Sequence, residues 1–176
     1  EAALEYDADT ILAHSVASIV ATLAAERPHS PIKTILSLEG NLTPEDAYFS
    51  GTAANFASPE KFLPSFLRRL DEVAETNAIL ERYRDMVETA DPKALWELGC
   101  DAHRFSQNTS PGDRLLESAN AVYLYNPMNL PKASLEWLAQ SAMLRYELPG
   151  ASHWPSLDQP GALSQSIALA LNRSST

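Results

Sequence analysis

The segment from Thr10 to Ser18 constrains the fold of this chain more than any other, because a short apolar run ends there in a serine between small residues. The residues from Ile11 to Ala13 are typical of the end of a buried strand, and apolar residues recur at helical spacing after the serine. Ser15 is therefore predicted to lie on a strand-to-helix turn. Ala13 and Ala17 suit a tight turn of this kind, since larger side chains would collide with the neighbouring strand or helix.

A turn of this kind lifts the Ser15 hydroxyl clear of the sheet and directs the backbone amide of Val16 toward whatever the hydroxyl attacks. The alternative interpretation is an ordinary helix cap, because serine is one of the residues preferred at that position. The segment by itself leaves both interpretations open.

Composition narrows the class of protein. With 176 residues, 45% of them hydrophobic and 20% charged, the chain is long enough for one domain with a substantial core. The formal net charge of -10 disfavours non-specific binding to nucleic acids or anionic membranes. The single cysteine, Cys100, excludes a disulfide framework and a cysteine-based metal cluster, and we expect neither a metal nor a cofactor. No apolar run suits a membrane span and no secretory signal is visible, so the cytoplasm is the default expectation.

A second strand is expected at Ile32 to Leu38, after a helix at Val16 to Arg27. A strand, a crossover helix and a strand in this order imply parallel pairing with a right-handed connection. Ser15 and Glu39 would then both stand at the carboxyl ends of adjacent parallel strands. That edge is where sites are built in open α/β sheets.

From Leu42 the chain shows helical periodicity with almost no strand signal, and the polar stretch Ser106 to Asp113 returns it to the sheet. Two more strands are expected at residues 121–125 and 143–148, with helices at 131–141 and 159–171. The predicted organisation is residues 1–43 as the first part of an α/β core, 44–113 as a helical insertion, 114–172 as the second part of the core, and 173–176 as a tail.

Three segments together resemble the α/β-hydrolase superfamily. They are residues 13–17, which resemble a nucleophile elbow, residues 38–46, and residues 150–155 with Asp158-Gln159-Pro160 after them. The elbow departs from G-x-S-x-G, because Ala13 and Ala17 stand where that pattern has glycines. The resemblance implies an open parallel α/β sheet with a helical cap insertion, here about four strands and apparently truncated.

The resemblance also implies a catalytic triad. Family members run a strand, a Gly-x-x-His turn that carries the catalytic base, and a closing helix, and residues 143–171 follow that layout. His153 is therefore expected to be the general base, since a neutral imidazole can take the Ser15 proton and return it to the leaving group. Val16 would supply an oxyanion-hole amide. The alternatives are a capping Ser15 and a structural loop histidine at position 153.

The acid that orients the base is less directly marked. In many family members it follows the strand that residues 121–125 would form, but the sequence there, Tyr125 to Asn129, has no carboxylate. Some members, haloalkane dehalogenases among them, carry the acid after the strand next to the nucleophile strand, where this chain has Glu39. The order Ser15, Glu39, His153 also follows the family order of nucleophile, acid and base. A surface or turn role for Glu39 is the alternative, with Asp46 and Asp113 as substitute acids.

Other residues are candidates for contact with substrate. Asn41, Trp154 and His14 are the candidate substrate-binding residues, with plain packing as the alternative, and His14 is expected to pack or orient rather than to take part in the chemistry. Aromatic residues of the insertion suggest either a lid over an apolar acyl pocket or the core of the insertion itself. These residues are Tyr48, Phe49, Phe56, Phe62, Phe66 and Trp96.

The resemblance implies a serine hydrolase that transfers an acyl group from an ester or related small-molecule substrate to water. The sheet of this family normally has about eight strands, and the chain shows only the last four. We therefore expect a partial chain that needs an N-terminal half or a second chain for activity. The alternatives are a catalytically silent binding or interaction module with this fold, and an acyltransferase.

Overall fold

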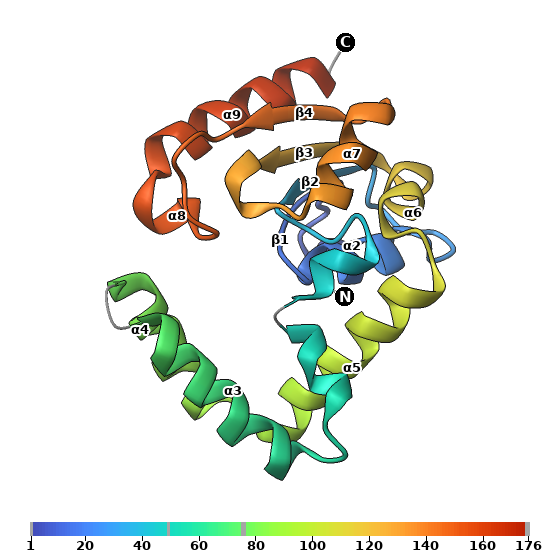
Figure 1. The fold of residues 1–176 in the computed structure, drawn as a ribbon. Coiled ribbons are helices and arrows are strands. Elements are labelled where there is room, and N and C mark those ends of the chain that lie inside the picture. The colour runs from blue at the N-terminus through green and yellow to red at the C-terminus, as the bar shows by residue number, and fades with distance from the viewer. Residues whose placement is uncertain (1, 49, 75–76, 175–176) are drawn as a thin grey trace. The chain divides into compact units, whose positions relative to one another are not determined.

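The computed structural model describes residues 2–48, 50–74 and 77–174 of the chain (Figure 1). The chain divides into two compact units, one made of Glu1–Asp46 with Ser106–Thr176 and the other of Ala47–Phe105. The second unit lies within the predicted insertion of residues 44–113. The predicted division into four segments stays a prediction.

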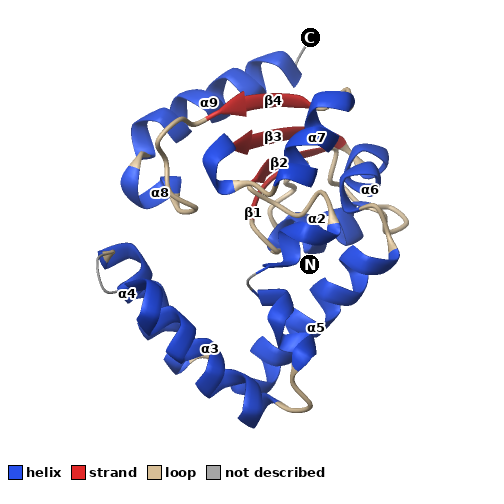
Figure 2. Ribbon diagram, viewed as in Figure 1, coloured by secondary structure: helices blue, strands red, loops and turns tan. Residues whose placement is uncertain are grey.

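The first unit contains a four-stranded sheet in which every pairing is parallel. Its spatial order follows the sequence, and β2 and β3 occupy the middle (Figure 2). Every residue of β2 is buried, Thr34 and Ser37 included, as expected for a central strand covered on both faces. The strands are β1 (Thr10–His14), β2 (Thr34–Leu38), β3 (Asn120–Tyr125) and β4 (Leu144–Glu147).

Helices cover the two faces of this sheet. One face packs on α2 (Ala17–Ala25), α6 (Pro111–Ser118) and α7 (Lys132–Gln140), which bury Ala21, Leu115 and Leu138 against Ile35 and Tyr123. The other face packs on α9 (Pro160–Ser174), which buries Leu163 and Ala170 against strands β2 and β3. Figure 1 shows α9 on the opposite side of the sheet from α7. This is the layered arrangement expected of a parallel sheet.

Strand β1 is an end strand of the described sheet. Leu12 on this strand is 46% exposed, and Val20 and Leu23 on the adjacent helix α2 are exposed as well. Large apolar side chains thus lie open along this edge. Short elements complete the first unit: α1 (Ala2–Glu5), η1 (Pro44–Tyr48, which runs into the second unit), η3 (Pro127–Asn129) and α8 (Pro155–Asp158).

The second unit is helical and has its own apolar core. Phe62, Phe66 and Leu70 of one helix pack with Val87 of the next. The indole Nε1 of Trp96 donates to two backbone carbonyls of the unit at 3.2 Å each. Its elements are η2 (Ser50–Asn55), α3 (Pro59–Ala74), α4 (Ala78–Thr89) and α5 (Pro92–Asn108). Over the described residues of both units, no helix combines the length and apolar character needed to cross a bilayer.

The connection at residues 106–113 differs from the expected polar link. Helix α5 continues to Asn108, and helix α6 begins at Pro111, where proline is tolerated in a first helical turn. Gly112 is required by packing rather than by a turn, because a Cβ there would lie 2.6 Å from the Trp137 ring. The Gly112 amide also donates to the Leu42 carbonyl at 2.9 Å. Both partners are distant in sequence, so Pro-Gly was misread as a loop signal.

Candidate active site

Ser15 occupies a strained turn between β1 and α2. Its φ is 56°, in the left-handed region that non-glycine residues rarely adopt and that costs on the order of 1–3 kcal/mol. The Ser15 amide donates to the Leu38 carbonyl at 2.9 Å, which continues the β1–β2 ladder into the turn. Val16 holds the N-cap position of α2, with no side-chain cap there. The capping alternative for Ser15 is therefore wrong.

Glu39 occupies the equivalent turn one strand along. Its φ is 46°, and its amide donates to the Leu124 carbonyl at 2.9 Å, so the ladder pattern repeats. The residue is 8% exposed, which makes a surface role for it wrong. The Glu39 Oε2 atom lies 2.7 Å from His153 Nδ1, while Oε1 accepts from two donors in the loop after β3.

His153 lies in the loop between β4 and α8, 114 residues from Glu39. With Nδ1 protonated, the imidazole donates to Glu39 Oε2 and leaves a lone pair on Nε2. The ring of His14 lies 4.7 Å from the His153 ring at 43°, and the Trp154 ring meets it edge-on at 5.2 Å. Ser15 and His153 both lie in the described part of the chain, and no hydrogen bond joins the Ser15 hydroxyl to the His153 ring there.

His14 connects the two turns that carry Ser15 and His153. Its Nε2 lies 2.7 Å from the His153 carbonyl oxygen, so the neutral ring donates to the backbone of the loop that carries His153. Burial, and after it the nearby His153 charge, lower the pKa of His14 and favour this neutral form. The orienting role of His14 stays a prediction.

The two substitute acids face other groups. Asp46 Oδ2 accepts the Leu42 and Thr43 amides at 2.8 Å each and the Ser134 hydroxyl at 2.7 Å. Burial raises the pKa of Asp46. Asp113 accepts the Trp137 indole N–H at 3.1 Å. Neither carboxylate hydrogen-bonds to His153, so Glu39 is the one of the three candidate carboxylates that contacts His153.

The remaining predicted residues lie near the same sheet edge. Asn41 is buried, and its backbone amide donates to Ser18 Oγ at 3.1 Å. Trp154 is half-buried at the start of α8. Val16 is half-buried directly after Ser15. Within the described ranges, no group of three or more His, Cys, Asp and Glu side chains is placed to hold a metal ion.

The arrangement of the fold is shared with solved structures of esterases. An esterase from Thermogutta terrifontis with malate bound matches with a TM-score of 0.63 at 16% identity, over 95% of this chain and 65% of that chain. The L374D mutant of esterase E22 matches with a TM-score of 0.62 at 15% identity, over 97% of this chain and 63% of that chain. Est816, titled an N-acyl homoserine lactone degrading enzyme, matches with a TM-score of 0.61 at 12% identity, over 95% of this chain and 70% of that chain. The chain has an α/β-hydrolase-like fold.

The α/β-hydrolase-like chain spans about two thirds of the length of these esterases. No family model and no curated protein matches its sequence. At identities below one fifth, the shared property is the fold.

Two residues that contact Glu39 were missed in the sequence. Asn126 and Asn129 stand after β3, and no role is predicted for them from the sequence, since that segment is used there only for its lack of a carboxylate. Both hydrogen-bond to Glu39, through the backbone amide of Asn126 and the side-chain amide of Asn129. Two asparagines three residues apart at this point of the fold were the available signal.

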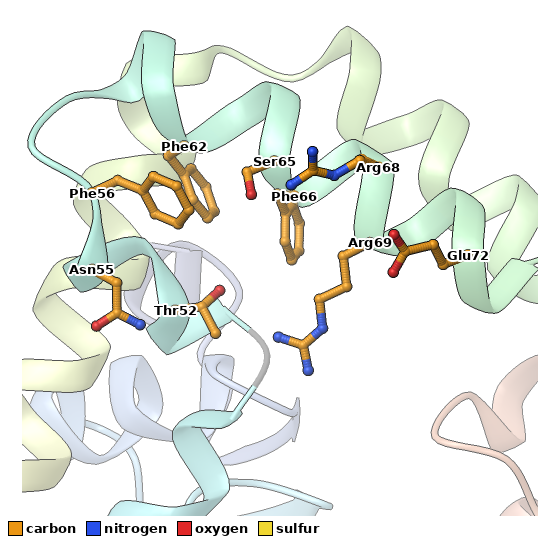
Figure 3. A pocket seen from close by; sticks show the side chains of 9 residues that line it. All are labelled: Thr52, Asn55, Phe56, Phe62, Ser65, Phe66, Arg68, Arg69 and Glu72. Carbon is orange, nitrogen blue, oxygen red and sulfur yellow. The ribbon is translucent and has the colours of Figure 1, made fainter.

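The helical unit of the α/β-hydrolase-like chain has a pocket of its own, with a volume of about 410 Å³. Figure 3 shows three phenylalanines on one side of it and two arginines with a glutamate on the other. Of the expected aromatic residues, Phe56, Phe62, Phe66 and Trp96 belong to the core of the unit, and the three phenylalanines also line the pocket. Tyr48 is 48% exposed, and Phe49 lies outside the described residues. The lining residues are Thr52, Asn55, Phe56, Phe62, Ser65, Phe66, Arg68, Arg69 and Glu72.

Proposed function

We propose that this chain belongs to a serine hydrolase that cleaves an ester or related acyl bond of a small molecule. Ser15 is the nucleophile, His153 the general base and Glu39 the acid that orients the base. The observation that carries the proposal is the 2.7 Å contact between His153 Nδ1 and Glu39 Oε2, at the sheet edge where Ser15 stands on a strained turn. A nucleophile, a base and an orienting acid at the carboxyl edge of a parallel sheet are the components of such a site.

The chemistry follows from the proton positions. His153 Nε2 takes the proton of Ser15 Oγ as that oxygen attacks the acyl carbon, and the carbonyl oxygen becomes an oxyanion. The imidazolium gives the proton to the leaving oxygen, and the acyl group stays on Ser15. Water, activated by the same imidazole, then releases the acid. Glu39 stabilises the imidazolium and holds the ring in the Nδ1–H tautomer.

Val16 is assigned the oxyanion contact. Its amide belongs to the start of α2, where the first amides of a helix have no intrahelical acceptor. The helix N-terminus also favours negative charge. Removing one such donor costs roughly 10²–10³ in kcat in a well-studied protease.

We further propose that the active form contains more of the sheet than these four strands. Exposed Leu12, Val20 and Leu23 line the β1 edge, and an uncovered edge strand with apolar neighbours is suited to pairing with another strand. A preceding segment or a second polypeptide would supply those strands. It would also supply a second oxyanion donor, because the oxyanion hole of this fold uses a second backbone amide from a loop after an earlier strand.

The test is labelling of residues 1–176 with a fluorophosphonate probe, with circular dichroism to confirm folding. Whatever labelling occurs, in residues 1–176 alone or with further strands supplied, should be lost in Ser15→Ala and His153→Ala. In Glu39→Gln the rate should fall on the order of 10²-fold or more, because the imidazole loses its orienting acceptor. Ser156→Ala, at an exposed serine of α8, is the matched control and should label normally.

Other outcomes separate the alternatives. A folded chain that stays unlabelled both alone and with its missing strands supplied would contradict the hydrolase and support a silent binding module. Labelling that appears only after the strands are supplied would support the partial-chain proposal.

A further inference from the structure

The loop after β3 carries an asparagine pair, Asn126 and Asn129, that contacts both the acid and the base loop. On Glu39 Oε1, the Asn126 backbone amide and the Asn129 side-chain amide each donate at 2.9 Å. On the Ala151 carbonyl, the side-chain amides donate at 2.6 Å from Asn126 and at 3.2 Å from Asn129. Ala151 stands two residues before His153. The pair therefore joins the two elements that hold the predicted acid and base.

We propose that Asn129 is a positioning residue that sets the orientation of the Glu39 carboxylate and, through it, the tautomer of His153. This inference rests on the proposed triad, because it assigns Asn129 a role in that same site.

The first argument concerns the Glu39 carboxylate. Only 3% of its side chain is exposed, so each oxygen needs a protein donor to offset the loss of water. Oε1 has two donors from the loop after β3, and Oε2 has His153 Nδ1. Rotation of the carboxylate would break contacts on both oxygens at once. The two donors on Oε1 therefore keep Oε2 facing the imidazole.

The second argument concerns the amide group of Asn129. Its nitrogen carries two hydrogens, and its two acceptors are Glu39 Oε1 and the Ala151 carbonyl. Both donors are used, and they bridge the acid to the base loop. An aspartate of the same shape would offer no donor to either oxygen and would place a second negative charge beside Glu39.

The experiment measures the ring ¹⁵N chemical shifts of His153 at alkaline pH in residues 1–176, with the signals assigned by their loss in His153→Ala. We expect the Nδ1–H tautomer in the natural sequence. Asn129→Leu and Asn129→Asp should both shift the ring toward a mixture with the Nε2–H tautomer, because both remove the donors. Agreement between a neutral and a charged replacement separates donor loss from added charge.

Two control variants accompany these changes. Met128→Ala removes a side chain that is 88% exposed in the same loop, and Asn172→Asp adds a charge at an exposed site of α9. Both should keep the natural tautomer. In the fluorophosphonate assay, both Asn129 variants should lower the maximal labelling rate about 10-fold with unchanged probe affinity, as expected for a lost hydrogen bond to a charged group.

The outcomes decide the inference. A natural sequence without the Nδ1–H tautomer, or Asn129 variants that keep it, would overturn the role of Asn129. A tautomer change in both variants, with no phosphonate labelling either of the chain alone or of the chain with further strands supplied, would support that role while contradicting the hydrolase. The tautomer measurement thus stands independently of activity.

Discussion

Gly40 follows Glu39 directly, and its replacement by alanine tests the packing that holds the turn at Glu39. An added Cβ would lie 2.3 Å from the Ser18 Cβ and 2.4 Å from the Ser37 Oγ. Ser18 and Ser37 are both buried, and rotating the Ser18 side chain does not move its Cβ. Backbone must therefore shift between the turn and helix α2. We expect Gly40→Ala to destabilise the protein.

The magnitude follows from three contributions. Overpacking a tight site costs typically 1–3 kcal/mol. Ser18 Oγ accepts the Asn41 amide at 3.1 Å, and losing that bond adds about 1 kcal/mol. Alanine lowers the entropy of the unfolded chain, which returns roughly 0.4–1 kcal/mol. The expected net loss in the free energy of unfolding is about 2 kcal/mol.

Urea unfolding followed by circular dichroism measures this loss. With an m-value of about 2 kcal/mol/M, the midpoint of Gly40→Ala should fall by about 1 M. Gly161→Ala is the matched control, because no atom lies within 4 Å of its added Cβ and Gly161 belongs to the same unit. Its midpoint should stay or rise slightly. Equal midpoints for the two variants would refute the packing argument.

Two further predictions concern pH. Burial raises the pKa of Asp46 above 3.8, so the stability it contributes is complete below pH 3.8 and is lost as the pH rises through the raised pKa. In urea unfolding, the free energy of unfolding of Asp46→Asn should therefore rise relative to that of the natural sequence as the pH rises through that window, and that of exposed Glu45→Gln should not. A stability difference between Asp46→Asn and the natural sequence that does not change with pH would contradict the assignment. Burial lowers the pKa of His14 below 6.5, so its contribution is complete above pH 6.5 and is lost as the pH falls through the lowered pKa. His14→Gln should reduce the dependence of the free energy of unfolding on pH in this range, and exposed His29→Gln should leave that dependence unchanged. An unchanged pH dependence in His14→Gln would show that His14 is not its source.

Local patterns were sufficient to predict the strands and the fold class. The run before Ser15 and the run before Glu39 are apolar, short and followed by turn residues, and both form parallel strands. The strand at 144–147 with the loop and closing helix after it was also recognisable. These signals are local because strand burial and turn formation depend on neighbouring residues.

Helix boundaries were less predictable where packing overrides local preference. The Pro111-Gly112 pair is a turn signal in isolation, yet it lies in the first turn of α6, where proline is tolerated and where Gly112 leaves room for the Trp137 ring. No residue near Gly112 in the sequence announces that contact.

By itself, the sequence determined the parallel α/β architecture and the residue types that stand at the ends of its strands. Only the tertiary structure decided which carboxylate meets His153, because Glu39, Asp46 and Asp113 are all available in the sequence and the choice depends on strand order and register. The same holds for Asn129, which contacts Glu39 across 90 residues. Contacts at this separation arise from the way parallel strands align their carboxyl ends, a property of the assembled sheet rather than of any one segment.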